Sequence, residues 1–203
     1  MTGDSDQKAK KFSDAGKALD EAEKLSQTKE DKTNVLFMRG AMYEREKKYD
    51  EAERTFRQVL DADPSNASAL NYLGYMLADR NVRLPEAQSL IEHAVKLEPN
   101  NYAYLDSLGW VYFKMNKLDE AEQQLTRSIQ LSSKDPTIHD HLGDVYFKEG
   151  KIKEAIAEWQ SSLKQWNSGP ASDAEPEDMA KVQKKLDSAR VRLAKGPNQG
   201  TKQ

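Results

Sequence analysis

A repeat of 34 or 35 residues runs through the middle of this 203-residue chain and constrains its fold more than any other feature. Two small residues mark each repeat, a glycine and, twelve or thirteen positions later, an alanine. The glycines are Gly40, Gly74, Gly109 and Gly143, and the alanines are Ala52, Ala87, Ala121 and Ala155. Four residues after each alanine comes a large side chain, namely Phe56, Ile91, Leu125 and Trp159. A period of this length indicates an array of similar structural units.

Each unit is predicted to be a pair of antiparallel helices. In the first helix apolar residues recur at offsets of three, four and seven, as at Leu70, Leu73 and Leu77, which is typical of an amphipathic helix. Glycine inside a helix costs about 0.5–1 kcal/mol relative to alanine. Its recurrence at one position therefore indicates that a neighbouring helix passes too close for a side chain. Asp50 and Asp119 are placed to serve as N-caps of second helices.

The period, the small residues, the large side chain and the following prolines, Pro64 and Pro99, together resemble the tetratricopeptide repeat (TPR) family. The resemblance runs from Asn34 to about Trp166, although Arg39 and His139 stand where other repeats have leucine. It implies an all-α fold, a right-handed α-solenoid of antiparallel helix pairs (a TPR superhelix) with terminal capping helices. The stretches 70–80 and 104–110 also look like the C-terminal regions of long bacterial multi-repeat adaptor proteins.

Both ends of the chain carry helical patterns outside the four repeats. Near the N-terminus, Phe12, Ala15 and Leu19 have the spacing of a second repeat helix, so residues 1–32 are either a capping helix or half of an interrupted repeat. Near the C-terminus an apolar stripe that includes Val182 and Leu186 predicts a capping helix or a detachable partner helix. The expected order is 1–32, repeats 33–66, 67–101, 102–135 and 136–166, linker 167–176, capping helix 177–195 and disordered tail 196–203.

Composition excludes several functional classes. Thirty-one Lys and Arg residues against 34 Asp and Glu residues leave no basic excess for nucleic acid. No apolar run approaches the roughly 18 residues of a membrane-spanning helix, and the acidic start predicts no signal peptide. The expected location is cytoplasmic for the chain as given, or periplasmic or exported if it is a fragment. Without cysteine, and with His139 and His141 on different helix faces, no metal or cofactor is expected.

Aromatic and acidic residues beside the core stripe of the first helices are the candidate binding residues. The family resemblance implies that these helices line a concave groove. Tyr72, Tyr75 and Trp110 are expected to be accessible there, whereas Phe113 and Phe147 are expected to pack between repeats. The candidate partner-binding set is Phe37, Asn71, Tyr72, Tyr75, Asp106, Trp110, Phe113, Asp140, His141 and Asp144.

These residues predict a non-catalytic scaffold that binds a protein or peptide segment with cationic or apolar side chains. Aromatic faces next to carboxylates favour such side chains, and the acids speak against the Lys/Asn/Arg clamp with which some TPR proteins hold a C-terminal carboxylate. Two alternatives stay open at this point. One is a self-assembly module, and the other is a hydrolase that uses Asp106, Asp140 and Asp144 as an acid/base set.

Overall fold

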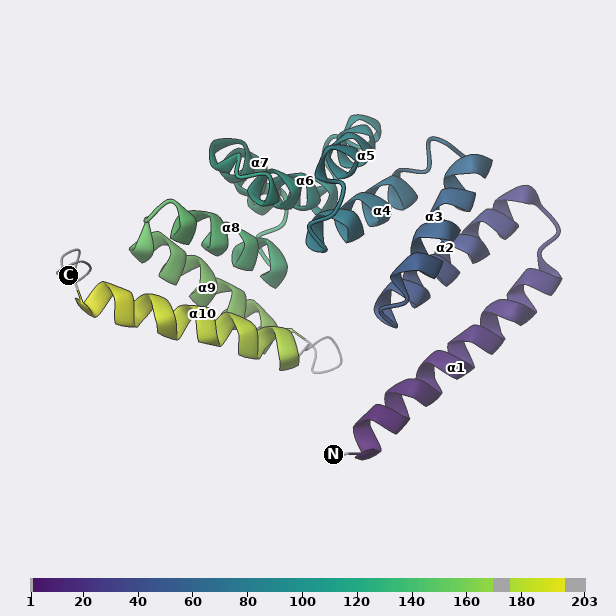
Figure 1. The fold of residues 1–203 in the computed structure, drawn as a ribbon, viewed down its shortest axis with the longest axis horizontal. Coiled ribbons are helices and arrows are strands. Elements are labelled where there is room, and N and C mark those ends of the chain that lie inside the picture. The colour runs from purple at the N-terminus through teal and green to yellow at the C-terminus, as the bar shows by residue number, and fades with distance from the viewer. Residues whose placement is uncertain (1, 170–175, 196–203) are drawn as a thin grey trace. The chain divides into compact units, whose positions relative to one another are not determined.

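The computed structural model describes residues 2–169 and 176–195, which form ten α-helices and no strand. The predicted all-α fold of helix pairs is confirmed (Figure 1). The predicted disordered tail 196–203 and most of the predicted linker lie outside the described residues. The helices are α1 Thr2–Leu25, α2 Lys29–Arg45, α3 Tyr49–Ala62, α4 Ala67–Asp79, α5 Leu84–Leu97, α6 Tyr102–Lys114, α7 Leu118–Leu131, α8 Pro136–Lys148, α9 Ile152–Ser168 and α10 Pro176–Lys195.

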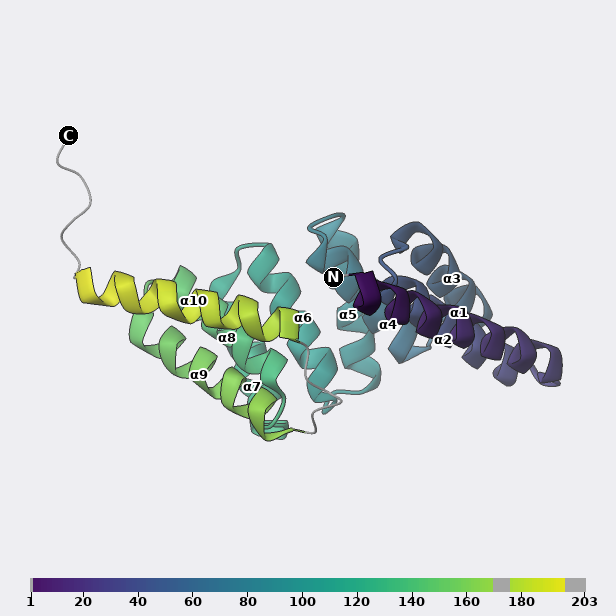
Figure 2. The same ribbon diagram turned by 90° about the horizontal axis from the view of Figure 1, so that it is seen from below.

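The chain divides into two compact units, Met1–Glu98 and Pro99–Gln203. Unit 1 contains α1 and the pairs α2/α3 and α4/α5, and unit 2 contains the pairs α6/α7 and α8/α9 and then α10. We call the first helix of each pair the A helix and the second the B helix. The two helices of a pair run antiparallel and pack along their length (Figures 1 and 2).

A glycine on each A helix faces a large side chain on its B helix, as the repeat predicts. A Cβ atom added at Gly109 would lie 2.6 Å from Cγ of Leu125 and 3.3 Å from the carbonyl oxygen of Ala121. The same clash would occur at Gly40 with Phe56, at Gly74 with Ile91 and at Gly143 with Trp159. All four large side chains are buried. Glycine is therefore required because the helix axes approach closely, and the facing side chain fills the space.

Each A helix is followed by a residue with left-handed backbone. These residues are Lys47, Asn81, Asn116 and Gly150, with φ values of 61°, 57°, 62° and 82°. The next N–H then reaches back to a carbonyl near the end of the helix, as from Lys151 to Tyr146 at 2.9 Å. This hydrogen bond closes the last turn of the helix in the way of a Schellman motif. This helix ending recurs in all four repeats, and the longer connection of the second repeat adds a second left-handed residue, Arg83, with a φ of 47°.

The prediction that Asp50 and Asp119 are N-caps is wrong. The helices α3 and α7 begin before these residues, and their N-caps are Lys48 and Lys117, which make no side-chain capping hydrogen bond. Both aspartates lie in the first helical turn, where their negative charge interacts favourably with the helix dipole. Side-chain caps occur instead on A helices, as where Asn66 accepts from the N–H of Ala69 at 3.0 Å.

The terminal helices pack on the repeats as caps. On α10, Val182, Leu186 and Ala189 are buried against a cluster of α9 that includes Trp159. At the other end α1 packs on α2, where Arg39 lies 3.0 Å from a carboxylate oxygen of Asp20 and 3.0 Å from one of Glu23. The departure of Arg39 from leucine is thereby explained, because its side chain ties α2 to the terminal helix.

We predict that Gly109→Ala destabilises the protein, because the new methyl group cannot be accommodated against Leu125 without displacing α7. Overpacking of this kind costs about 1–3 kcal/mol. The matched control is Gly16→Ala in α1, where an added Cβ would meet nothing within 4 Å and the better helix propensity of alanine contributes up to about 1 kcal/mol. Urea denaturation measures both changes, and equal stability of the two variants would contradict the close-approach explanation.

Candidate functional site

Unit 1 presents aromatic side chains on its A helices. Tyr72 of α4 is 42% exposed and Met38 of α2 is 58% exposed. The ring of Phe37 meets the ring of Tyr72 edge-on at a centroid distance of 5.2 Å, and the buried ring of Phe56 supports Tyr72 at 5.7 Å. Tyr75 lies one turn further along α4 and is partly buried. We call Phe37, Met38, Tyr72 and Tyr75 the Tyr72 surface.

Two carboxylates interact at the C-terminal ends of the same helices. Burial raises the pKa of Glu44, Arg45 lowers it, and the negative charge of Asp79 raises it further, with the net result that the pKa is raised. A carboxylate whose pKa is raised by burial and by a like charge is stabilised by a nearby cation. Unit 1 therefore combines accessible aromatic faces with a place where positive charge is favourable.

Asn71, a candidate binding residue, does not reach this surface. It is buried, with 8% of its surface exposed, and its Oδ1 atom has no hydrogen-bond partner among the described residues. Asn71 precedes Tyr72 on α4, and the one-residue step turns its side chain toward the interior. The structure thus separates two neighbouring residues that the sequence pattern grouped together.

Trp110 is buried, and the prediction that it is accessible is wrong. Only 8% of its surface is exposed, because the imidazole of His141 on α8 stacks on its ring at a centroid distance of 4.1 Å and an interplanar angle of 16°. Phe113 stacks with Trp110 at 5.1 Å and packs against the cluster between the two pairs of unit 2. The prediction that Phe113 packs between repeats is confirmed.

The same imidazole binds a buried carboxylate. Nδ1 of His141 lies 2.8 Å from Oδ1 of Asp106, and both residues are buried, with 4% and 7% of their surfaces exposed. Burial alone would lower the pKa of His141, but the negative charges of Asp106, Asp140 and Asp144 outweigh it and the pKa is raised. The raised pKa favours the protonated imidazole, and its contact with Asp106 joins α8 to α6.

A lysine of α10 occupies the remaining acids. Nζ of Lys185 lies 2.9 Å from Oδ1 of Asp140 and 2.7 Å from Oδ2 of Asp144. Burial raises the pKa of Asp144, and Lys185 opposes that rise. Burial would lower the pKa of Lys185, but the two carboxylates outweigh it and raise that pKa. The two acids that were expected to meet a cationic ligand are already paired with a cation of this chain.

The contact of His141 with Asp106 and that of Lys185 with Asp140 occupy equivalent positions on their helices. The buried stripe of α10, Val182, Leu186 and Ala189, has the spacing of Ile138, Leu142 and Val145 on α8, and α10 runs parallel to α8 (Figures 1 and 2). Lys185 precedes Leu186 as His141 precedes Leu142, and each cation binds the acid two positions before the corresponding leucine of the preceding A helix. The helix α10 therefore occupies the place of an A helix. This shared spacing is the sequence signal that could have identified Lys185.

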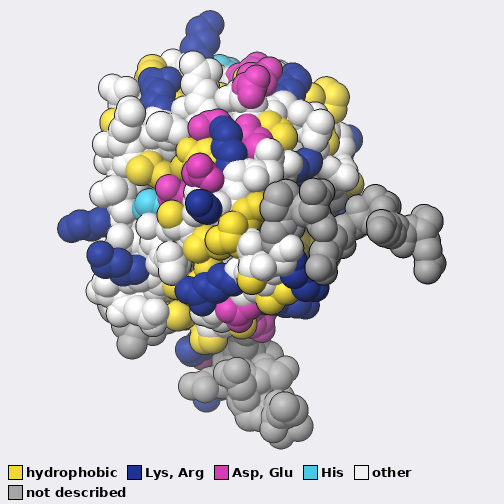
Figure 3. Space-filling view, turned by 90° about the vertical axis from the view of Figure 1, so that its left-hand side faces the viewer, with side chains coloured by type: hydrophobic (Ala, Val, Ile, Leu, Met, Phe, Trp, Pro, Cys, Tyr) yellow, Lys and Arg dark blue, Asp and Glu magenta, His cyan; other side chains and the backbone are white. Residues whose placement is uncertain are grey.

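A pocket opens in unit 2 where α8 and α10 end, and we call it the α8/α10 pocket. Two of its residues carry cations over aromatic rings, with Nζ of Lys148 4.8 Å from the ring centroid of Phe113 and Cζ of Arg192 5.0 Å from that of Phe147. Figure 3 looks onto this end of unit 2 and shows Lys and Arg side chains beside hydrophobic ones. The lining residues are Phe113, Asp144, Phe147, Lys148, Glu149, Gly150 and Arg192.

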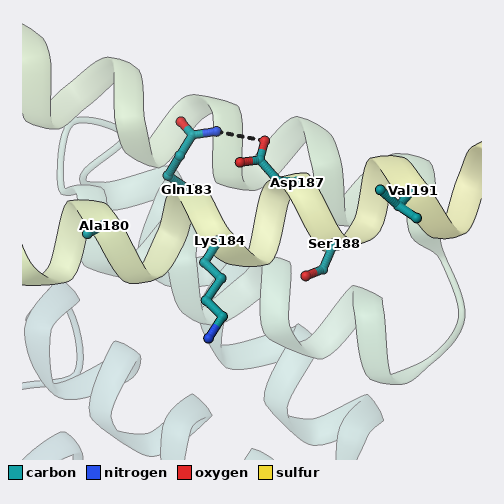
Figure 4. A pocket seen from close by; sticks show the side chains of 6 residues that line it. All are labelled: Ala180, Gln183, Lys184, Asp187, Ser188 and Val191. Atoms are coloured by element: carbon teal, nitrogen blue, oxygen red, sulfur yellow. Dashed lines mark hydrogen bonds between the residues drawn. The ribbon is translucent and has the colours of Figure 1, made fainter.

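A second depression lies on the outer face of α10 and is lined by residues of that helix alone. Figure 4 shows Lys184 and Ser188 on one side of the helix and Gln183 and Asp187 on the other, where Gln183 donates a hydrogen bond of 2.9 Å to Asp187. Since no other described element faces it, this depression is a helix surface and offers no second wall to a ligand.

Within residues 2–169 and 176–195, no helix is long and apolar enough to cross a bilayer. The same residues contain no group of three or more His, Asp and Glu side chains that could hold a metal ion. The three acids considered for hydrolysis do not share an open cleft, because Asp106 is buried against His141 while Asp140 and Asp144 share Lys185.

Comparison of the sequence with known proteins gives matches to TPR proteins. Residues 12–139 match the family model of the Psidin N-terminal TPR repeats region. A TPR repeat-containing protein of Pseudomonas aeruginosa is 44% identical over 96 residues, which cover 47% of this chain and 16% of that protein. The chain thus spans about a sixth of the length of this curated relative.

Solved structures show the same fold at low sequence identity. A chain of the APC/C hetero-tetramer Cut9–Hcn1 is similar with a TM-score of 0.73 and 22% identity, over 79% of this chain and 30% of that one. A thermophilic TPR protein of Thermus thermophilus is similar with a TM-score of 0.70 and 18% identity, over 91% of this chain and 93% of that one.

We predict that Lys185→Met destabilises the protein at pH 7 by about 1–3 kcal/mol, because it leaves two partly buried carboxylates without a cation. The deficit should shrink as the pH falls, since the pKa of Asp144 is already raised and protonation removes the unpaired charge. Lys184→Met is the control, because Lys184 is exposed on the outer face of α10. Thermal melts at pH 7 and pH 4.5 measure the stability of both variants. Equal melting temperatures for the two variants would contradict a stabilising role of the ion pairs of Lys185 with Asp140 and Asp144.

Proposed function

The chain belongs to the tetratricopeptide repeat family, and on that premise we propose that it is a protein–protein interaction scaffold that binds a partner segment through the Tyr72 surface. The fold of antiparallel helix pairs supports an interaction scaffold in general terms. The observation that carries the choice of surface is the 42% exposure of Tyr72, whose ring is supported by contacts with the rings of Phe37 and Phe56.

A supported aromatic ring is a favourable anchor for binding. Its position is already fixed in the free protein, so little conformational entropy is lost when a partner packs on it. Tyr, Trp and Arg are the residues that most often dominate binding energy in interfaces. Met38, which is more exposed than Tyr72, adds an adaptable apolar side chain on the neighbouring A helix.

The partner segment that suits this surface carries apolar side chains and at least one cation. Aromatic faces accept both apolar groups and cations. The raised pKa of Glu44 supports the cation, because a positive group near Glu44 and Asp79 would relieve the repulsion between them.

Five other candidate residues contact one another or α10 in unit 2 and are not part of the Tyr72 surface. Trp110, Asp106 and His141 form a buried stack and ion pair, so substituting Trp110 is expected to lower stability rather than to weaken binding selectively. Asp140 and Asp144 bind Lys185. Self-association stays a prediction, which light scattering at two protein concentrations would test.

We predict that Tyr72→Ala weakens binding of a selected peptide by about 2 kcal/mol, or roughly 30-fold. The peptide would be chosen from a random displayed library by its affinity for the unaltered chain, and Kd would be measured by fluorescence anisotropy. Tyr102→Ala is the matched control, because Tyr102 is 40% exposed at the start of α6.

The selected peptides should be enriched in Lys, Arg and apolar residues, and the control variant should bind them normally. If Tyr72→Ala binds as the unaltered chain does, or if the two variants lose affinity equally, the Tyr72 surface is not the binding site.

A further inference from the structure

We infer that the α8/α10 pocket is a second binding surface, which takes an acidic protein segment with an aromatic or other apolar side chain. This surface lies in unit 2, uses none of the residues of the Tyr72 surface, and has the opposite charge preference. It therefore extends the proposed function and does not depend on it.

The apolar part of the pocket consists of two phenylalanines at equivalent positions of successive A helices, since each lies four residues after the helix glycine. Phe113 and Phe147 are both partly buried. Phe147 packs on Trp159 at a ring distance of 5.5 Å and against the cluster shared by α9 and α10. Two supported and partly exposed rings can receive an apolar side chain of a partner.

The cations of the pocket lack carboxylate partners. Lys148 and Arg192 are exposed, and among the described residues neither forms an ion pair, although each lies over an aromatic ring. A cation that is held over a ring stays close to the apolar side chains while its outer face remains available. Each can therefore meet a carboxylate that accompanies an apolar side chain.

Each acid that lines the pocket is paired with a lysine, which it shares with a second acid, since Lys185 also binds Asp140 and Lys151 also binds Glu122. Oδ2 of Asp144 lies 2.7 Å from Nζ of Lys185, and Oε2 of Glu149 lies 2.9 Å from Nζ of Lys151. The lining charges that have no ion-pair partner among the described residues are therefore the two exposed cations, Lys148 and Arg192. An acidic segment can form ion pairs with these two cations beside apolar contacts, whereas the lining acids that a cationic segment would need are already bound to lysines.

The probe is a fluorescein-labelled synthetic peptide in which one phenylalanine is flanked on each side by two glutamates. The comparison peptide carries lysines in place of the glutamates. We expect the acidic peptide to bind, with affinity that falls as salt rises, and the lysine peptide to bind at least about tenfold more weakly. Amide chemical-shift changes on binding should concentrate at residues 147–150 and near Arg192.

Charge reversal then identifies the residues involved. Lys148→Glu and Arg192→Glu should each weaken binding of the acidic peptide about tenfold or more, whereas Arg190→Glu, a reversal at a half-exposed position of the same helix, should not. Far-ultraviolet circular dichroism and melting would verify folding. Should a reversal variant misfold, Lys148→Gln and Arg192→Gln test the same contacts with less perturbation.

Three results would overturn the inference. They are equal or tighter binding of the lysine peptide, a loss of affinity in Arg190→Glu as large as in Arg192→Glu, and chemical-shift changes confined to α2 and α4. Tyr72→Ala should leave binding of the acidic peptide unchanged, so failure of this surface is distinguishable from failure of the Tyr72 surface.

Discussion

The close approach of the two helices in each pair is the constraint on which the rest of the structure depends. A glycine on the A helix leaves space that the buried Phe56, Ile91, Leu125 or Trp159 of the B helix fills. Because the contact recurs at the same position, each A helix is set in the same orientation on its B helix. Within each unit, the residues on either side of the glycine then meet the other A helix in a fixed register, and this register decides which side chains are paired and which stay exposed.

In unit 2 this register pairs the acids that the sequence suggested for ligand binding with cations of neighbouring helices. A buried charge without a partner is strongly destabilising, so Asp106 requires His141, and Asp140 and Asp144 require Lys185. Once these ions are paired, the accessible chemistry lies at the edges of the A helices. In unit 1 the accessible side chains are aromatic, with carboxylates nearby. In unit 2 they are aromatic, with exposed cations that form no ion pair among the described residues. The two proposed surfaces could thus bind segments of opposite charge.

The sequence predicts the fold well and the site only in part, for a physical reason. The repeat identifies the helix pairs, the close glycine contacts and the apolar stripe of α10, because each depends on spacing within one or two helices. Exposure of Trp110 depends instead on His141, which belongs to the next repeat, and the availability of Asp140 depends on Lys185, which follows a further helix and the stretch 170–175. Tyr72 stays exposed although its neighbour Asn71 is buried, a difference of one residue that helical periodicity alone does not resolve.

The protonation of His141 tests most directly whether the buried polar residues of the A helices hold neighbouring helices together through charge pairing. The imidazole nitrogen signals of His141 would be followed by NMR across pH in the unaltered chain and in Asp106→Asn. Pairing with Asp106 predicts a midpoint above the ordinary value of about 6.5 in the unaltered chain. It also predicts a lower midpoint in Asp106→Asn, where burial remains and the partner charge is gone. A midpoint at or below the ordinary value in the unaltered chain, or no change in the variant, would contradict the account.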